Sequence, residues 1–323
     1  QAKLYDVPAI VRIETDSFDD PWSAESITKD VTAGSGVYVA VAEADKYLMD
    51  DEYLWSIVTS PTIPRAFVHI RRPKAIDLGC PVCGQNINKY GNYPWKVDHL
   101  KRPWKLECPE CKIIFPTNDF GAYYNSGLDN KGIFRKEKAD NNLLKNELYP
   151  EKGEAWGIDD GFGWKNGDNT WTFIAYYNHW AIWYNGFVQN ALRTFKNAYI
   201  YTGDIKYARA GIILLDRIAD FYPNMDITDF SWEDGFDNGT PYMNTAQGRI
   251  LHDIWETVLI TEFVSAYDAF FPILNDSVPG NVVQFLSKKA EQYDIDSYKH
   301  SVGGIRKNIE DNLIRQVLLD GNL

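Results

Sequence analysis

The chain is short of basic residues, cysteines and long apolar runs, and each shortage excludes a class of function. Its 33 lysines and arginines stand against 45 aspartates and glutamates, so the formal net charge is −12. Nucleic-acid binding rewards clustered lysine and arginine, and we therefore expect no nucleic-acid partner. No apolar run reaches the roughly 18 residues that a membrane-spanning helix needs, so we expect no membrane partner.

Clean strand patterns are also missing. No stretch of Val, Ile and Thr alternates with polar residues well enough to predict a large β-sheet, and the chain is therefore expected to be mainly helical. No signal peptide is visible at the N-terminal end, where Gln1 fits a mature start.

Aromatic residues, in contrast, are abundant. The chain has 11 Trp, 20 Tyr and 16 Phe, which together make up 15% of its residues. Such an excess often fills a core, but it also suits carbohydrate binding, because ring faces stack on sugar faces. Rings are concentrated in two polar loops, around Trp156, Phe162 and Trp164 and around Trp232. These loops predict either sugar-stacking walls or small hydrophobic clusters that stabilise the loops themselves.

All four cysteines belong to one pattern. Cys80 and Cys83 form one C-x-x-C knuckle, Cys108 and Cys111 form a second, and 24 residues separate the two. This spacing is typical of a four-thiolate zinc site, and each knuckle would close a small strained ring if it were oxidised internally. Two disulfides and a redox pair are the alternatives. A four-cysteine zinc site has no open position, so the predicted zinc is structural. A second divalent metal elsewhere is left open.

The chain divides into three predicted parts. Residues 1–75 are expected to form an N-terminal helical segment, and residues 76–118 a small zinc-ribbon-like module of two short β-hairpins. A polar stretch up to about residue 168 is expected at the surface. Residues 119–323 are expected to form the body of an incomplete (α/α) toroid that continues beyond the chain end, because the helices are fewer than a closed double ring needs.

Apolar periodicity predicts the helices. The expected ranges are 24–47, 170–201 (as two helices or one bent helix), 205–221, 247–271, 282–293 and 305–319. Between the second and third of these, Gly203 is expected to take the left-handed conformation that ends a helix, and Asp204 to cap the next one.

Four segments resemble the N-terminal half of the heparinase II/III-like polysaccharide lyases. They are IPR (63–65), DLGCPVCG (77–84), YTGDIKYA (201–208) and GRILHDIWE (248–256). The resemblance covers roughly residues 40–323. It implies an alginate or glycosaminoglycan lyase, with an incomplete toroid followed by antiparallel β-sheet domains, and an acidic polysaccharide as the substrate. We accordingly expect a secreted or periplasmic protein.

The resemblance also implies β-elimination at a uronate. A base removes the C5 proton, a neutralising group offsets the carboxylate charge, and an acid, commonly the same tyrosine, protonates the leaving O4. In the family the Asn or His neutraliser follows a segment that resembles residues 309–314, and the catalytic tyrosine lies further on. The main catalytic motif is therefore expected beyond Leu323, and no catalytic residue is carried over.

Local constellations supply weaker site candidates. Asn178 and His179 are flanked by aromatic residues, and His179 is either a catalytic candidate or a histidine packed in the core. Tyr242 is a second catalytic candidate. Substrate contact is predicted for four residues in or just after a polar loop, because a guanidinium pairs well with a uronate carboxylate. They are Tyr242, Asn244, Arg249 and His252.

Two other functions remain open. Asp159-Asp160 and Glu233-Asp234 could be the paired acids of an α/α-toroid glycoside hydrolase, although adjacent acids usually belong to a solvated loop. A non-catalytic carbohydrate-binding toroid, stapled by zinc, is the third reading. A lyase would leave an unsaturated uronate, a hydrolase would add water, and a binding domain would form no product.

Overall fold

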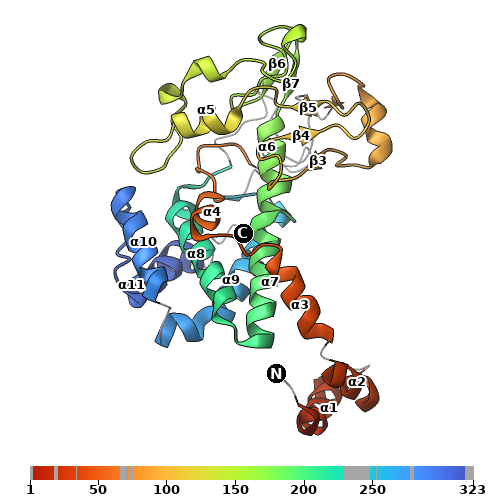
Figure 1. Ribbon diagram of the computed structural model, residues 1–323, viewed down its shortest axis with the longest axis vertical. Helices are drawn as coiled ribbons and strands as arrows, with labels where there is room; N and C mark the ends of the chain where they lie inside the picture. The colour runs from red at the N-terminus through yellow and green to blue at the C-terminus, as the bar shows by residue number, and fades with distance from the viewer. Residues whose placement is uncertain are drawn as a thin grey trace.

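The computed structural model describes residues 3–17, 21–33, 35–65, 71–72, 76–227, 248–251, 253–276 and 280–316. This part of the chain is mainly helical, with short strands gathered at one end and the hairpin of α1 and α2 at the other (Figure 1). The α-helices are α1 (Val7–Ser17), α2 (Ala24–Ala33), α3 (Ser35–Asp45), α4 (Asp51–Ser56), α5 (Phe120–Ser126), α6 (Phe173–Tyr177), α7 (Phe187–Thr202), α8 (Ile205–Phe221), α9 (Asp253–Asp276), α10 (Gly280–Gln292) and α11 (Val302–Ile309).

The strands form three small antiparallel sheets. Their bounds are β1 (Arg71–Arg72), β2 (Ile76–Asp77), β3 (Lys96–Val97), β4 (Leu106–Glu107), β5 (Ile114–Phe115), β6 (Trp164–Asn166) and β7 (Asn169–Trp171). β1 pairs with β2, β6 pairs with β7, and β3, β4 and β5 form a meander in that order. In the cysteine module the second knuckle lies in the hairpin of β4 and β5, and the first is closed by an isolated antiparallel bridge between Cys80 and Gly84.

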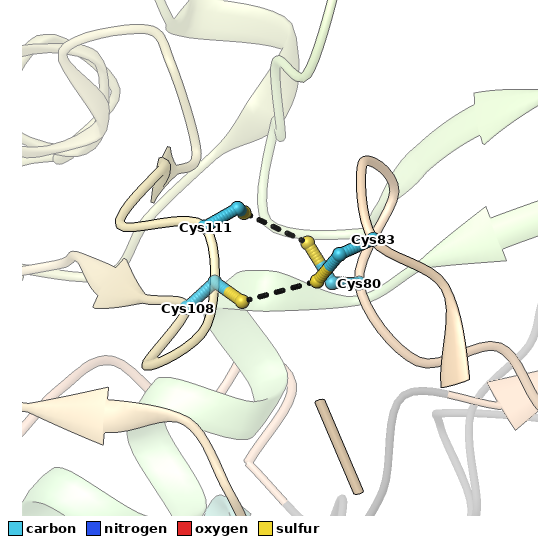
Figure 2. A group of neighbouring side chains, drawn as sticks. All are labelled: Cys80, Cys83, Cys108 and Cys111. Atoms are coloured by element: carbon cyan, nitrogen blue, oxygen red, sulfur yellow. Dashed lines mark hydrogen bonds between the residues drawn. The ribbon is translucent and has the colours of Figure 1, made fainter. Parts of the chain in front are cut away.

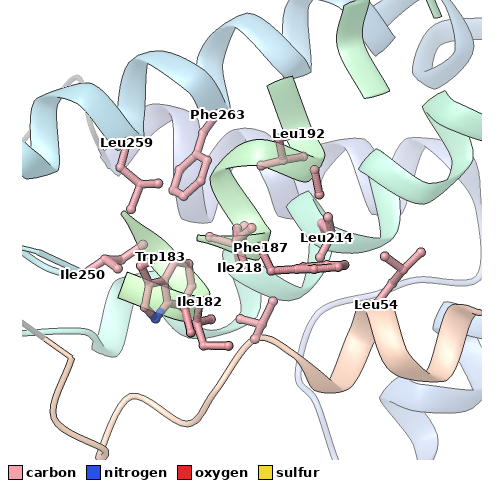
Figure 3. Packing of buried hydrophobic residues seen from close by; sticks show 14 of the residues in the cluster. Leu54, Ile182, Trp183, Phe187, Leu192, Leu214, Ile218, Ile250, Leu259 and Phe263 are labelled. Carbon is pink, nitrogen blue, oxygen red and sulfur yellow. The ribbon is translucent and has the colours of Figure 1, made fainter. Parts of the chain in front are cut away.

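Helices α7, α8 and α9 make the centre of the fold. α7 packs against both α8 and α9, and α3 lies along α7 as well. Figure 3 shows side chains from α4, α7, α8 and α9 meeting in one cluster, with Leu54, Phe187, Leu214 and Phe263 among them. All four are fully buried. Burying a leucine or phenylalanine side chain contributes about 1.5–3 kcal/mol, so this cluster is a main source of stability.

The turn between α7 and α8 confirms a prediction made from single residues. Gly203 has φ 68° and ψ 9°, and its N–H donates to Tyr199 O over 2.7 Å. The Asp204 carboxylate accepts from Lys206 N over 3.0 Å and caps α8. The predicted helix 205–221 is also confirmed, since α8 spans Ile205–Phe221.

Four other predicted helices are divided or shifted. The expected helix 24–47 is two helices, α2 and α3, and residue 34 between them lies outside the described residues. The expected segment 170–201 consists of α6, a π-helical turn (Asn178–Trp183) and α7. α9 begins at Asp253 rather than near residue 247, and α11 passes into a second π-helical segment, Glu310–Ile314.

Trp255–Asn275, within α9, is long and apolar enough to cross a membrane by length and composition alone. The same test is passed by core helices of soluble proteins. Leu259, Phe263 and Phe270 of this helix are fully buried in the described structure. Glu262 forms ion pairs with Arg193 and Lys196 of α7. One third of the apolar window is buried, and Val258, Val264 and Phe271 are exposed, so the helix packs on the core along one face only.

The polar stretch between residues 119 and about 168 was expected at the surface, but it contains several buried aromatic side chains. Phe120, Tyr123 and Phe134 are buried in a second hydrophobic cluster. The Trp156 ring lies 5.2 Å from Phe115 and 5.9 Å from Trp164, measured between ring centroids. Trp164 is also buried, so these rings stabilise the loop to which they belong.

Replacing Gly211 by alanine is expected to loosen the contact of α8 with α9. A Cβ at Gly211 would lie 2.2 Å from Cε2 of the fully buried Phe270 ring. Overpacking of this kind costs about 1–3 kcal/mol. Gly303→Ala in α11 is the matched control, because its Cβ would meet no atom within 4 Å and alanine favours a helix by up to about 1 kcal/mol. Urea unfolding of both variants measures the difference; equal midpoints would contradict the packing argument.

Candidate metal centre and candidate binding surface

The four cysteines lie together. Cys80 and Cys83 face Cys108 and Cys111 across a narrow gap, each pair on its own loop (Figure 2). Sγ of Cys80 is 3.6 Å from Sγ of Cys111, and the same distance separates Cys83 from Cys108. All four sulfurs lie within 4.8 Å of one another, and none is in a disulfide. Among the described residues, this is the one group of His, Cys, Asp or Glu side chains that could hold a metal ion.

The main chain shapes each knuckle. Cys80 N donates to Gly84 O over 3.1 Å, and Gly84 N donates back to Cys80 O over 2.8 Å. The backbone crosses so closely here that a Cβ on Gly79 would lie 2.3 Å from Gly84 O. At the second knuckle Cys108 O accepts from Lys112 N over 3.0 Å. Main-chain hydrogen bonds therefore close both loops.

Metal binding at this group is coupled to the loss of thiol protons. Burial raises the pKa of the Cys80 thiol well above its ordinary value, and it raises the pKa of Cys83 to about 11. At Cys108 burial has the same effect but is outweighed by main-chain N–H groups of Cys111 and Glu110, so its pKa is lowered. Four thiolates at these distances would repel one another, and a bound cation removes this repulsion. The site is suited to a metal ion.

A second group of residues surrounds the π-helical turn Asn178–Trp183. The His179 side chain is fully buried, with its ring centroid 4.9 Å from that of Trp180 and 5.8 Å from that of Tyr184. Trp180 in turn lies 4.3 Å from Tyr93, and Tyr184 lies 4.6 Å from Trp255. We call Tyr93, Trp180, Tyr184 and Trp255 the aromatic cluster. Tyr93 is exposed and the other three are half-buried, so the rings reach the surface.

Buried polar contacts join the chain segments behind the aromatic cluster. Asn178 Nδ2 donates to Pro64 O over 3.0 Å. The fully buried Arg65 donates to Pro61 O over 2.7 Å and also to Arg249 O. Segments 61–65, 178–184 and 249–256 are therefore held together, although up to 184 residues separate the bonded pairs.

Glu256 holds the start of α9 in this layer. Its carboxylate accepts from Ile250 N over 3.1 Å and from Leu251 N over 2.6 Å. Tyr222 Oη donates to it over 3.3 Å. Burial raises the pKa of Glu256 to about 7, against the lowering effect of these N–H groups and of the Arg65 charge. The carboxylate is fully enclosed, so its role here is to position the segment.

The predicted site residues fall in different places. Tyr242, Asn244 and His252 lie outside the described residues, as do Trp232, Glu233 and Asp234. Arg249 Nη1 donates to Tyr222 O over 3.3 Å and to Pro223 O over 3.0 Å, which ties part of its guanidinium to the end of α8. Its predicted contact with substrate stays a prediction, as does any catalytic role of His179.

Asp159 and Asp160 are placed differently from each other. Asp159 is fully buried and accepts from the N–H groups of Gly161, Gly163 and Ile174 over 2.7, 2.8 and 3.1 Å. Burial raises its pKa to about 7, although these N–H groups oppose the change. Asp160 forms an ion pair with Lys136 over 2.6 Å. Asp159 stabilises a turn, and its buried carboxylate cannot contact a sugar. The pair Asp159 and Asp160 therefore does not support a hydrolase.

Sequence reasoning did not single out Tyr93, Tyr184 or Trp255. Trp255 lies within one of the segments that carry the lyase resemblance, which was an available signal. Tyr93 and Tyr184 had no distinguishing pattern, because their significance comes from contacts across the fold. Comparison of the chain with family models, curated proteins and solved structures finds no match.

Proposed function

We propose that this chain is the helical, incomplete-toroid portion of a polysaccharide lyase that acts on a uronate-containing polymer, alginate or a glycosaminoglycan. One observation carries the proposal. The segments around Arg65 and Arg249, which resemble polysaccharide lyases in sequence, are hydrogen-bonded to each other, and Asn178 joins Pro64 to the base of the aromatic cluster. Their convergence beneath partly exposed rings fits a sugar-binding surface.

In this proposal the aromatic cluster binds and orients the polymer. Ring faces of Trp180 and Trp255 contact the apolar C–H faces of the sugars, while the cation of Arg249 favours a nearby uronate carboxylate. β-Elimination then needs a base at C5, neutralisation of the carboxylate and a proton for O4. We assign no described residue to the base. His179 is enclosed, so its most direct contribution is to hold the aromatic rings in place.

We propose zinc as the ion at the four cysteines. With Zn–S bonds of about 2.3 Å, a tetrahedral site has sulfurs roughly 3.8 Å apart, close to the observed 3.6 Å. When bound, zinc would crosslink the two knuckles and supply no reactive position. The cysteine module would then serve to hold Tyr93, which follows the first knuckle, at the edge of the aromatic cluster.

The lyase proposal predicts that the chain binds one of alginate, heparan sulfate, chondroitin or hyaluronan. It also predicts a new ultraviolet absorbance from unsaturated uronate when a chain extended to include the catalytic motif expected beyond Leu323 is mixed with that polymer. Trp180→Ala should raise KM by about tenfold, the loss expected for one stacking contact. Trp22→Ala is the matched control, because Trp22 is 60% exposed and belongs to none of these contacts; it should leave KM unchanged.

Other outcomes would identify a different function. Saturable glycan binding by the extended chain, without a product on any of the four polymers, would contradict the lyase and favour a carbohydrate-binding domain. New reducing ends without the ultraviolet signal would indicate hydrolysis. Equal effects of Trp180→Ala and Trp22→Ala would remove the aromatic cluster from the binding surface.

A further inference from the structure

A groove lies beside the β6–β7 hairpin, at the end of the molecule where Figure 1 shows the short strands. Its volume is about 770 Å³, within the range of about 300–1,000 Å³ that small-molecule sites occupy. None of its lining residues belongs to the aromatic cluster or to the four cysteines. It is therefore a separate feature from the site described above.

The groove combines rings with ammonium groups. Trp156, Phe162 and Trp164 line it, together with Lys136 and Lys165. Trp156 and Phe162 are half-buried, so part of each ring remains open to a ligand. Lys136 Nζ lies 4.9 Å from the Phe162 ring centroid, while Lys152 Nζ lies 5.0 Å from that of Trp156. Positive charge is thus held next to each of these two rings.

The charge of the groove is opposite to that of the chain. Two lysines and a single acid, Asp160, line it, whereas the chain as a whole carries −12. Lys136 pairs with Asp160 over 2.6 Å, and its side chain is still 51% exposed. An ammonium has three donors, so one carboxylate partner does not exhaust it. Lys165 is exposed at the rim on β6. A ligand with carboxylate or sulfate groups complements this arrangement.

We propose that this groove is a second, non-catalytic binding site for an acidic oligosaccharide. Trp156 and Phe162 contact the C–H faces of the sugars, and Lys136 and Lys165 bind their carboxylates. This inference does not depend on the lyase chemistry. It extends the proposed function, because a long acidic polymer could bind at two sites on the same chain. Two linked sites on one polymer raise the overall affinity beyond that of either site alone.

Calorimetric titration with a saturated tetrauronate from alginate tests the proposal, with cellotetraose as the neutral probe of the same length. The wild-type chain should bind two tetrauronates, and Trp180→Ala should weaken one of these two sites by about tenfold while leaving the groove site unchanged. In the Trp180→Ala background, Lys136→Gln with Lys165→Gln should weaken the groove site by about tenfold, as expected for two partly exposed charge contacts. Cellotetraose should bind this site more weakly than the tetrauronate.

Lys138→Gln with Lys145→Gln is the matched control. It removes the same charge from exposed lysines on the same stretch of chain, outside the groove lining, and should leave the affinity unchanged. If Trp180→Ala does not fold, the groove pair in the wild-type background should weaken one of the two sites by about tenfold and leave the other unchanged.

Equal affinity of the groove and control variants would overturn the proposal, as would equal binding of cellotetraose. The lyase assay is read separately, on the extended chain. A groove that binds while no unsaturated product forms would contradict only the proposed function, and product formation with a single binding site would contradict only this inference.

Discussion

Loss of the metal from the four-cysteine site is expected to be the most damaging single change to this protein. Cys108→Ser should abolish binding of one equivalent of zinc and lower the free energy of unfolding by several kcal/mol, on the order of 5. Cys108 is fully buried, and Leu106 and Phe115 on the adjoining strands are buried with it. Without the ion, the remaining thiols hold the two knuckles only through weak contacts.

The effect should spread beyond the cysteine module because the module is packed on the helical body. Phe115 stacks on Phe173 of α6 at 4.7 Å between ring centroids. Trp171 Nε1 donates to Gly79 O over 3.2 Å, which joins β7 to the first knuckle. A loosened module would therefore expose rings of α6 and β7 to water and destabilise the start of the helical core.

Elemental analysis and thermal unfolding, with and without a strong chelator, measure these effects. Lys89→Ala is the control, because it removes only an ion pair with Glu110 beside the knuckle. This pair is solvent-exposed, and the variant should keep its zinc and its Tm. A purified chain that contains no metal and unfolds at the same temperature after chelator treatment would contradict the structural role of the site.

Lys299→Met is expected to cost about 3–5 kcal/mol, the loss seen when one partner of a buried ion pair is removed. Lys299 is fully buried, and its Nζ lies 2.6 Å from Asp216 Oδ2 and 2.6 and 2.7 Å from the two oxygens of Asp220. Asn308 Nδ2 donates to both carboxylates over 2.9 Å. This network joins α8 to α11 and to the turn before it.

The pKa shifts of Lys299 and Asp216 show how the Lys299 ammonium stabilises the buried carboxylates. Burial alone would lower the pKa of Lys299, but Asp216 and Asp220 together raise it. Burial raises the pKa of Asp216 to about 6, and the Lys299 charge works against that rise. With methionine at position 299, the buried carboxylates of Asp216 and Asp220 would face each other with only the Arg217 guanidinium, 3.5 Å from Asp220, to offset their charge. The folded state would then bind protons more tightly than the unfolded state, so lowering the pH should reduce the deficit.

Denaturant unfolding at neutral and at acidic pH tests this prediction. Lys206→Met is the matched control, since Lys206 pairs with Asp45 and Asp204 but is 45% exposed. Its cost should be below about 1 kcal/mol. If Lys299→Met and Lys206→Met were equally stable, or if the deficit of Lys299→Met grew on acidification, the buried network would not have the stabilising role described here.

Features that depend on neighbouring residues could be predicted from the sequence. The C-x-x-C spacing predicted the four-cysteine cluster because each knuckle brings two sulfurs together within four residues. Gly203 and Asp204 predicted the break between α7 and α8 because one residue can adopt a left-handed conformation and the next can cap a helix. Apolar periodicity likewise predicted α8 and the mainly helical composition.

Features that depend on distant residues were decided by the tertiary structure. Nothing near Lys299 in the sequence indicates that it meets Asp216, which lies 83 positions earlier. The aromatic cluster draws Tyr93, Trp180 and Trp255 from three separate segments. From the sequence Asp159 was a candidate catalytic acid, but in the structure its carboxylate is buried and accepts hydrogen bonds from three main-chain N–H groups. Sequence patterns report short-range geometry, whereas burial and long-range pairing are determined only when the whole chain packs around a common core.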